Sequence, residues 1–466
     1  MRVLLISHDF LPAHPSGTEI YTAQLSRRLR ERGLEVQLFT TEKDISAEHL
    51  SLRVREFEGM RVHELVNNLF YEAFVETYDW DGPLEAFGRV LDEFQPEVIH
   101  VMHLLYLSIG CVEEAKRRGI PVVYTLHDFW LQCARFGQRI HHDGAICHTI
   151  DFDRCGTCLV QLKFSQTKLE RRMARLVAGV KGLTGIGLER PVRLAAKLLS
   201  PKGKAAQAPA MDPAAAQHMA AQARLREETI LKRLVPAVER FFAPSAFLRE
   251  RFVEWGIPAH QIEHVPNGIE PQPAPACASS EAPRPGLRVA FLGTLAPHKA
   301  PHLLLEAWEL IGAERRARAS LTLYGPKQHF PEYVDSMQSA AKRLGVELPG
   351  GLSREEVPRL WSTVDLLVIP SVWYENAPLT ILEARSAGTA VLVSDLGGMA
   401  EMVQEGKTGW RFPTGDAKAL AQRLMEWIDD PSLLERLELD PAGVKSMQTC
   451  TDEMIAHYQA LLGGRP

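Results

Sequence analysis

The stretch that most constrains the fold of this chain covers residues 366–387. It begins with an uninterrupted apolar run, 366–369, which predicts a buried strand of a parallel sheet. A polar loop follows, and residues 379–384 predict a helix, with Pro378 at its first position because no N–H is needed there. This order is typical of an α/β sheet, which binds ligands at the carboxyl ends of its strands and anions at helix N-termini.

Two carboxylates flank this loop. Glu375 lies in the loop, Glu383 lies about one turn inside the predicted helix, and seven residues separate them. The two carboxylates can therefore contact different parts of one extended ligand, with anion-binding backbone between them. A nucleotide sugar has this layout, because a diphosphate joins its sugar to its ribose. Two glutamates alone would favour ordinary surface roles instead.

Other short motifs change that balance. In chain order they are Ser16-Gly17-Thr18-Glu19, His127-Asp128-Phe129-Trp130, Phe242-Ala243-Pro244-Ser245, Val265-Pro266-Asn267-Gly268-Ile269, Gly293-Thr294-Leu295 with Lys299, Glu375 with Glu383, Val391-Leu392-Val393-Ser394-Asp395, Gly397-Gly398-Met399-Ala400-Glu401 and Gly406-Lys407-Thr408-Gly409. With these motifs the chain resembles the retaining glycosyltransferases of family 4, which have the GT-B fold. The resemblance covers most of the chain, and it is specific for the family but weak for any one substrate.

The resemblance implies an α/β protein of two Rossmann-like domains that face each other across a cleft. It also implies transfer of a glycosyl group from a nucleotide diphosphate sugar to an acceptor hydroxyl with retention of configuration. No metal or other cofactor is expected for this step. The departing phosphate would help to deprotonate the acceptor on the same face of the sugar.

Site residues follow from the same resemblance. The expected catalytic residues are His127 and Glu375 at the donor sugar, and Lys299 as a point charge on the diphosphate. The expected donor-binding residues are Gly17, Gly293, Thr294, Asn376, Ala377, Pro378, Leu379 and Glu383. Many relatives carry an Arg where this chain has Thr294. Lys299 and backbone amides would therefore have a larger share in holding the phosphates.

Length and composition bound the remaining possibilities. The 466 residues suffice for two or three domains, and the formal charge of -5 argues against a dedicated nucleic-acid binder. No apolar run approaches the ~20 residues of a membrane span. The start, MRVLLISHD, predicts a first strand rather than a signal peptide. We therefore expect the cytoplasm, with any membrane contact peripheral and at the inner face.

The predicted domains follow the pattern of strands and linkers. Residues 1–270 form the N-terminal Rossmann-like acceptor domain, with strands near 3–7, 36–40, 96–101, 120–126 and 240–244. A Pro- and Ala-rich boundary follows at 266–286. Residues 287–445 form the C-terminal nucleotide-sugar domain, with strands at 288–292, 321–324, 366–369 and 390–393. Residues 446–466 form a last helix that crosses back to the first domain.

A cysteine-rich loop, residues 133–158, interrupts the first domain. Its four cysteines, Cys133, Cys147, Cys155 and Cys158, include a C-x-x-C pair and predict a structural zinc site. Free or redox-active thiols are the alternative. A catalytic zinc is disfavoured, because four sulfur ligands leave no open position.

A basic helical insertion is predicted over residues 160–236. Between 163 and 204, eleven Lys and Arg residues face only two glutamates, and apolar residues interleave with them. Such a stretch can lie on an anionic membrane face. A solvated helix face that covers the domain is the alternative.

The sequence thus predicts a glycosyltransferase of cell-surface polysaccharide or glycolipid biosynthesis, with a glycan or lipid-linked acceptor. A phosphorylase lacks support, because no lysine motif indicates bound pyridoxal phosphate. A catalytically silent binding or scaffold subunit is the other alternative, and loss of Glu375, Glu383 or Lys299 would have favoured it.

Overall fold

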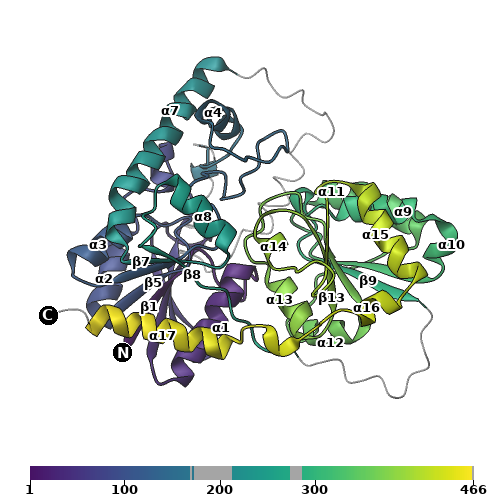
Figure 1. Cartoon of the computed structure of the whole chain (residues 1–466). Helices are drawn as coiled ribbons and strands as arrows, with labels where there is room; N and C mark the ends of the chain where they lie inside the picture. The colour runs from purple at the N-terminus through teal and green to yellow at the C-terminus, as the bar shows by residue number, and fades with distance from the viewer. Residues whose placement is uncertain (168–169, 173–211, 273–285, 464–466) are drawn as a thin grey trace. The chain divides into compact units, whose positions relative to one another are not determined.

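A computed structural model describes residues 1–167, 170–172, 212–272 and 286–463 of the chain. The chain divides into two compact units (Figure 1). Unit 1 comprises Met1–Phe242, Phe252–Glu263 and Met454–Pro466. Unit 2 comprises Ala243–Arg251 and His264–Glu453. Each unit is built around one sheet.

The first sheet has eight strands in the order β3-β4-β2-β1-β5-β6-β7-β8. In chain order the strands are β1 (Arg2–Ile6), β2 (Glu35–Glu42), β3 (Leu52–Phe57), β4 (Met60–Val66), β5 (Val98–Val101), β6 (Val122–Thr125), β7 (Arg240–Ala243) and β8 (Ile262–His264). Strand β1 pairs in parallel with β2 and β5, and its residues from Val3 to Ile6 are fully buried. Burial on both faces explains why this strand is continuously apolar.

The helices of this unit connect and cover the strands. They are α1 (Gly17–Glu31), α2 (Leu84–Phe94), α3 (Gly110–Arg117), α4 (Phe152–Val160), α7 (Pro213–Thr229), the end of α8 (Ala246–Trp255) and the end of α17 (Met447–Gly463). In α17, Tyr458 is fully buried and its Oη lies 2.6 Å from Nδ1 of His100 on β5. The last turns of α17 therefore form part of the core of unit 1.

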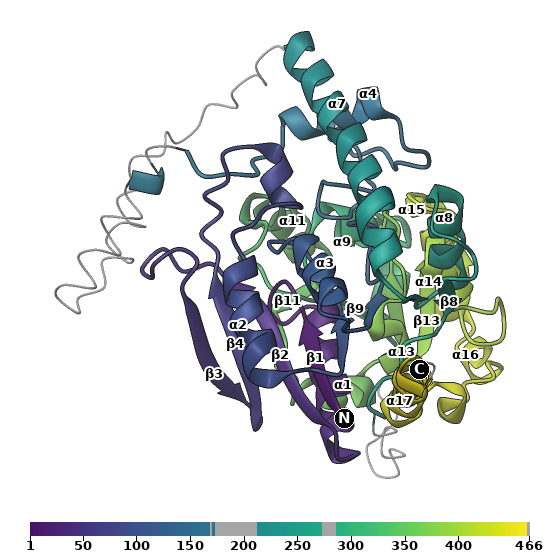
Figure 2. The same cartoon turned by 90° about the vertical axis from the view of Figure 1, so that its left-hand side faces the viewer.

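Helices α4 and α7 pack closely side by side (Figures 1 and 2). Asp151 caps α4 by accepting hydrogen bonds from the backbone N–H groups of Asp153 and Arg154. A Cβ atom on Gly156 would lie 2.2 Å from the carbonyl oxygen of Ala216 on α7. The C-x-x-C pair thus lies on a helix rather than in a loop, and its central glycine permits the helix contact.

The second sheet has six strands in the order β11-β10-β9-β12-β13-β14, and its described pairings are parallel. The strands are β9 (Leu287–Leu292), β10 (Ala319–Tyr324), β11 (Glu347–Gly350), β12 (Leu366–Ile369), β13 (Ala390–Ser394) and β14 (Trp410–Phe412). The helices are α9 (Pro301–Leu310), α10 (Gly312–Arg316), α11 (Pro331–Leu344), α12 (Val357–Leu360), α13 (Leu379–Ser386), α14 (Gly397–Glu401), α15 (Ala417–Asp429) and α16 (Ser432–Glu435).

Two hydrophobic clusters lie on opposite faces of this sheet. Leu366 and Val368 belong to the cluster that contains Trp308 and Trp427, whereas Leu367 belongs to the other cluster. Successive strand residues point to opposite faces, so both faces of β12 are packed. The apolar run over 366–369 is therefore the buried parallel strand that the sequence predicts.

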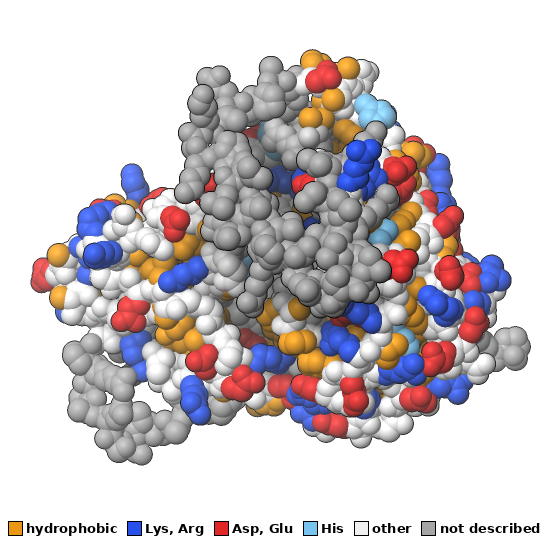
Figure 3. Space-filling model, turned by 180° about the vertical axis from the view of Figure 1, so that it is seen from behind, with side chains coloured by type: hydrophobic (Ala, Val, Ile, Leu, Met, Phe, Trp, Pro, Cys, Tyr) orange, Lys and Arg blue, Asp and Glu red, His pale blue; other side chains and the backbone are white. Residues whose placement is uncertain are grey.

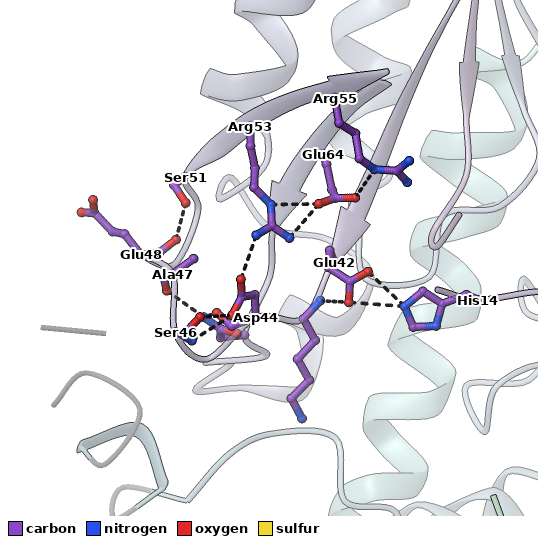
Figure 4. A network of polar contacts seen from close by, with 12 residues as sticks. His14, Glu42, Asp44, Ser46, Ala47, Glu48, Ser51, Arg53, Arg55 and Glu64 are labelled. Atoms are coloured by element: carbon purple, nitrogen blue, oxygen red, sulfur yellow. Dashed lines mark hydrogen bonds and ion pairs between the residues drawn. The ribbon is translucent and has the colours of Figure 1, made fainter. Parts of the chain in front are cut away.

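The α/β class with two largely parallel sheets is confirmed, and several details differ from the prediction. Pro378 is the N-cap of α13 rather than its first helical residue. The pattern also missed the antiparallel pair β3 and β4, because their charged residues obscure strand periodicity. Glu64 of β4 is one example, being buried between Arg53 and Arg55 (Figure 4).

Most of the predicted basic stretch lies outside the described residues. Among its described members, Lys163 pairs with Glu170 and Arg171 pairs with Glu72. On the face shown in Figure 3, acidic and basic side chains of the described residues are interspersed. No helix in the described ranges has the length and apolar character needed to cross a membrane.

Candidate functional site

Three loops of unit 2 leave the sheet at the same edge. Strands β9, β12 and β13 are neighbours in the sheet and run in parallel, so the loops that follow them start side by side. The loop after β9 contains the 3-10 turn Pro297–Lys299, and the loop after β12 contains Glu375. Since parallel α/β sheets bind ligands at this edge, the loops form the candidate donor site.

Glu375 is the polar centre of this site. Lys299 Nζ lies 2.5 Å from Glu375 Oε1. The hydroxyl of Ser371 and the indole N–H of Trp373 donate hydrogen bonds to the same oxygen over 2.9 and 2.8 Å. Nζ of Lys299 also lies 5.0 Å from the centroid of the Trp373 ring, within the range of a cation–π contact. Residues from two loops thus hold one carboxylate in a fixed position.

The same contacts keep Glu375 ionised. Burial of the carboxyl raises its pKa, but the charge of Lys299 and the three hydrogen bonds outweigh that effect and leave the pKa below its usual value. The side chain is only 9% exposed. Glu375 is therefore a buried carboxylate that carries its charge at neutral pH.

Close backbone packing fixes the segment after Glu375. The backbone N–H of Gly398, in α14, donates to the carbonyl oxygen of Glu375 over 3.0 Å. A Cβ atom on Gly398 would lie 1.8 Å from the carbonyl oxygen of Asn376, so only glycine fits there. Asn376 itself is buried. The glycine motif after β13 thus packs against the loop that contains Glu375 and fixes its backbone.

Helix α13 begins directly after this loop, at Leu379, so its first free N–H groups lie beside Ala377 and Pro378. Glu383 follows one turn later. Burial raises the pKa of Glu383 to about 7, and the nearby charge of Arg354 only partly opposes this. The two predicted glutamates therefore differ in charge state near neutral pH, and Arg354 is a neighbour that the motif did not indicate.

Gly293 and Thr294 lie at the carboxyl end of β9. The N–H of Gly293 donates to the carbonyl oxygen of Tyr324 over 3.0 Å. A Cβ atom on Gly325 would lie 2.0 Å from the carbonyl oxygen of Gly293. Two neighbouring strand ends therefore approach closely here, and Thr294 stays partly exposed at the same edge as Lys299.

His127 lies at the corresponding edge of the sheet of unit 1, directly after β6. Burial, followed by the charge of His103, lowers the pKa of His127 to about 3. The ring packs against Tyr21 of α1 with centroids 5.2 Å apart. His127 is thus a neutral imidazole, which can both donate and accept a hydrogen bond.

Around His127 the fold gathers groups that the motifs did not identify as a site. His103 Nε2 lies 3.1 Å from Asp128 Oδ2, and its ring lies 4.4 Å from that of His8 at the end of β1. Burial raises the pKa of the adjacent Asp9 to about 6. For His8, Asp9 and His103 the sequence signal is that each follows a buried strand, whereas Asp128 belongs to the motif that begins at His127.

Glu19 is the most buried carboxyl of this group. It is 1% exposed, and neither oxygen has a hydrogen-bond partner among the described residues. Its Oε1 lies 3.6 Å from Nδ1 of His8, and burial raises its pKa to about 8.

At the start of the same helix, a Cβ atom on Gly17 would contact nothing within 4 Å. The packing of the fold therefore does not require glycine at position 17, and space is open beside this first residue of α1.

A polar network holds the loop between β1 and α1 (Figure 4). His14 Nε2 lies 3.1 Å from a carboxylate oxygen of Glu42 at the end of β2. A guanidinium N–H of Arg55 donates to the carbonyl oxygen of Leu11 over 2.7 Å. The loop that leads to Gly17 is thus anchored to β2 and β3.

The four cysteines do come together in unit 1, where they line one cavity. However, the described residues contain no group of three or more His, Cys, Asp or Glu side chains arranged to hold a metal ion. Cys158 Sγ lies 3.6 Å from Nδ1 of His141, while the thiol of Cys147 faces the carbonyl oxygen of Thr149 at 3.2 Å. The zinc prediction is therefore not supported, because the thiols face different partners.

Comparison with known families gives two matches. Residues 278–439 match the family "Glycosyl transferases group 1", and residues 15–160 match "Glycosyltransferase Family 4". The first range contains Lys299, Glu375 and Glu383, and the second contains Gly17 and His127.

Individual relatives match over parts of their length. A D-inositol 3-phosphate glycosyltransferase of Streptomyces avermitilis is 32% identical over 36% of this chain and 38% of its own length. A lipopolysaccharide 1,2-N-acetylglucosaminetransferase of Salmonella typhimurium is 30% identical over 37% of this chain and 48% of its own length. The chain therefore matches less than half the length of these curated relatives.

Solved structures match over the whole chain. Sucrose-phosphate synthase from Thermosynechococcus elongatus has a TM-score of 0.66 at 18% identity and full coverage of both chains. Anabaena HepE in complex with UDP and glucose has a TM-score of 0.61 at 15% identity, covering 99% of this chain and 100% of that one. Together with the two family matches, this fold shows that the chain belongs to the group 1, family 4 glycosyltransferases of GT-B fold.

Proposed function

We propose that this chain transfers a sugar from a nucleotide diphosphate sugar to an acceptor hydroxyl with retention of configuration. The observation that carries the proposal is the pairing of Lys299 with the buried carboxylate of Glu375 at the ligand-binding edge of the sheet of unit 2. A buried charge is costly unless it is paired and hydrogen-bonded. The fold retains one here, at the edge of the sheet where we place the donor.

The donor would lie along the loop after β12. An ammonium group has three N–H donors, so Lys299 can hold Glu375 and diphosphate oxygens together. The first N–H groups of α13 add to the anion site. Glu375 would accept hydrogen bonds from hydroxyls of the sugar. Glu383, one helical turn away, would accept hydrogen bonds from hydroxyls of the ribose.

The chemical step moves one glycosyl group and one proton. The bond from the anomeric carbon to the diphosphate oxygen breaks, and a bond from that carbon to the acceptor oxygen forms on the same face. The acceptor proton passes to the departing phosphate. Lys299 and the N-terminus of α13 would stabilise the charge that develops on the diphosphate. In unit 1, we assign to His127 a contact with the sugar being transferred. We assign to Gly17 a close approach of the backbone to the diphosphate.

The relatives suggest where to search for substrates. Besides the Salmonella enzyme, an O-antigen chain mannosyltransferase B of Escherichia coli is 29% identical over 37% of this chain. We therefore propose a role in cell-surface polysaccharide or glycolipid synthesis. A UDP-sugar is the first donor to test, because the Anabaena structure holds UDP and glucose. The described cysteines are free thiols, which suits the reducing cytoplasm.

The test is release of nucleotide by the purified chain from UDP-glucose, UDP-N-acetylglucosamine, GDP-mannose and ADP-glucose, with a panel of oligosaccharide acceptors. We expect acceptor-dependent release with one donor, and loss of that release in Glu375→Gln. A chain that binds a nucleotide but releases none with any acceptor would instead be the silent binding subunit.

A further inference from the structure

Unit 1 contains a cavity of about 380 Å³, within the size range of small-molecule sites. Six aromatic side chains contribute to its wall: Tyr71, Phe74, Tyr106, Trp130, Phe136 and Phe164. Ala134 and Phe136 come from the cysteine-rich segment, and Leu162 to Gln166 follow α4 directly. The segment that the zinc prediction concerned therefore contributes two residues to the wall of this cavity.

The cavity lies next to the histidine cluster of the same unit. Its wall residue Trp130 donates a backbone hydrogen bond to Asp128 Oδ1 over 2.7 Å. The ring of Tyr106, another wall residue, lies 6.2 Å from the ring of His8. A molecule in the cavity is thus close to the strand ends that present Asp128 and His127.

The wall also carries polar side chains. They are Lys43, Thr77, Lys163, Ser165, Gln166, Glu170 and Arg226. Glu170 is held by a 2.6 Å contact with Lys163, and this hydrogen bond lowers the pKa of Glu170 to about 2. The cavity therefore presents a carboxylate acceptor and several N–H and O–H groups beside aromatic rings.

We infer that this cavity binds a saccharide, namely the terminal sugar units of the acceptor glycan. A sugar ring has C–H faces that pack on aromatic rings and hydroxyls that pair with amide, hydroxyl and carboxylate groups. Both kinds of partner are present on the same wall. The inference rests on the proposed function, since it names the acceptor class of that reaction.

A hydrocarbon chain or an anionic headgroup suits this wall less well. Alkyl groups offer no hydrogen bond to the polar groups of the wall and would displace the water that solvates them, which costs free energy. A phosphate suits the wall less well because Lys163 is already paired with Glu170, and the guanidinium of Arg226 already donates to the backbone carbonyls of Leu131 and Trp130. The saccharide satisfies the aromatic and the polar parts of the wall together.

The experiment uses the full chain and two kinds of probe: an array of lipid-free oligosaccharides, and decyl phosphate in solution. Phe136→Ala and Phe164→Ala remove partly exposed wall residues, so the fold should tolerate both changes. Leu225→Ala is the matched control, because this exposed apolar residue of unit 1 lies outside the cavity wall. We expect binding to a subset of the oligosaccharides, at least tenfold weaker in both Phe variants and unchanged in Leu225→Ala.

Three outcomes would overturn the inference. The first is binding of decyl phosphate, but of no oligosaccharide, in a manner that requires Phe136 and Phe164. The second is oligosaccharide binding that neither Phe variant weakens, and the third is binding of neither probe. Donor-dependent nucleotide release is measured on the same samples. Nucleotide release that persists without saccharide binding contradicts this inference alone. Failure of nucleotide release with every donor counts against the proposed function.

Discussion

Lys299 Nζ lies 2.5 Å from Glu375 Oε1, although the two residues are 76 positions apart in the chain. The carboxylate of this ion pair is buried, and the two loops follow strands that are neighbours in one sheet. Because each residue holds the other, we expect their functional effects to be strongly coupled.

Glu375→Gln should lower kcat by on the order of 10²-fold, because it removes a fixed charge at the reacting sugar. Lys299→Ala should lower kcat as well. It should also destabilise unit 2 by about 3 kcal/mol, since it leaves a buried carboxylate without its cation. The double variant Lys299→Ala, Glu375→Gln should be more stable than Lys299→Ala alone. Donor-dependent nucleotide release and urea unfolding measure both effects.

Glu332→Gln is the control for this cycle, because Glu332 is exposed in the first turn of α11. Additive losses of stability in the double variant would contradict the coupling. The pKa of Glu375 is depressed, so the stabilisation by the pair is complete above the ordinary value of 4.5 and is lost as the pH falls through the lower folded-state pKa.

Glu383→Gln should mainly raise the donor KM, because the ribose contact is the same in the ground state and the transition state. The pKa of Glu383 is about 7, so donor affinity of the unmodified chain should rise as the pH increases through that value and the carboxylate forms. The variant should lack this rise. Calorimetric titration with UDP-glucose, whose diphosphate diester keeps its charge in this range, checks the prediction. Equal pH dependence in both chains would refute it.

Glu19→Gln should make unit 1 more stable at alkaline pH. The folded state keeps the proton of Glu19 up to a pKa of about 8, whereas the unfolded chain releases it near 4.5. Stability therefore falls as the pH rises between these values, by on the order of 1 kcal/mol per pH unit. Glutamine has no proton to lose, so its unfolding free energy should vary less. Denaturation at about pH 5 and pH 9 tests this, with the exposed Glu31→Gln at the end of the same helix as control.

Glu401→Gln should reduce stability without abolishing turnover. The carboxylate of Glu401 accepts hydrogen bonds from the backbone N–H groups of Ala246 and Phe247, each over 2.8 Å, at the start of α8. Loss of a charged cap of this kind costs about 1 kcal/mol. Thermal melts and kcat measure the two effects. A larger fall in kcat than Glu375→Gln produces would mean that Glu401 takes part in the reaction.

Cys155 should resist alkylation in the folded chain. Burial raises its pKa to about 12, so almost none of the reactive thiolate is present at neutral pH. Treatment with iodoacetamide at about pH 8, followed by mass spectrometry, should modify Cys155 far more slowly in native protein than in urea. Equal rates in the two conditions would show that the thiol is accessible and ionisable.

Local pattern determined much of this protein. The apolar run 366–369 is buried on both faces, so its sequence alone predicts a central parallel strand. The position of Glu375 after that strand and of Glu383 inside the next helix follows from chain order. The same reasoning places His127 at a strand end, because β6 is a short buried run that stops just before it.

Only the tertiary structure decided which distant groups meet. It brings Lys299 to Glu375, leaves the carboxyl of Glu19 buried 3.6 Å from His8, and directs the clustered cysteines to separate partners. It also explains how the charged strands β3 and β4 can pair in the sheet, because Arg53 and Arg55 neutralise Glu64 across the pair. The periodicity of a sequence indicates whether a residue is buried. The contacts between loops depend instead on strand order and on the free-energy cost of burying each charge. Neither of these can be predicted from a local stretch of sequence.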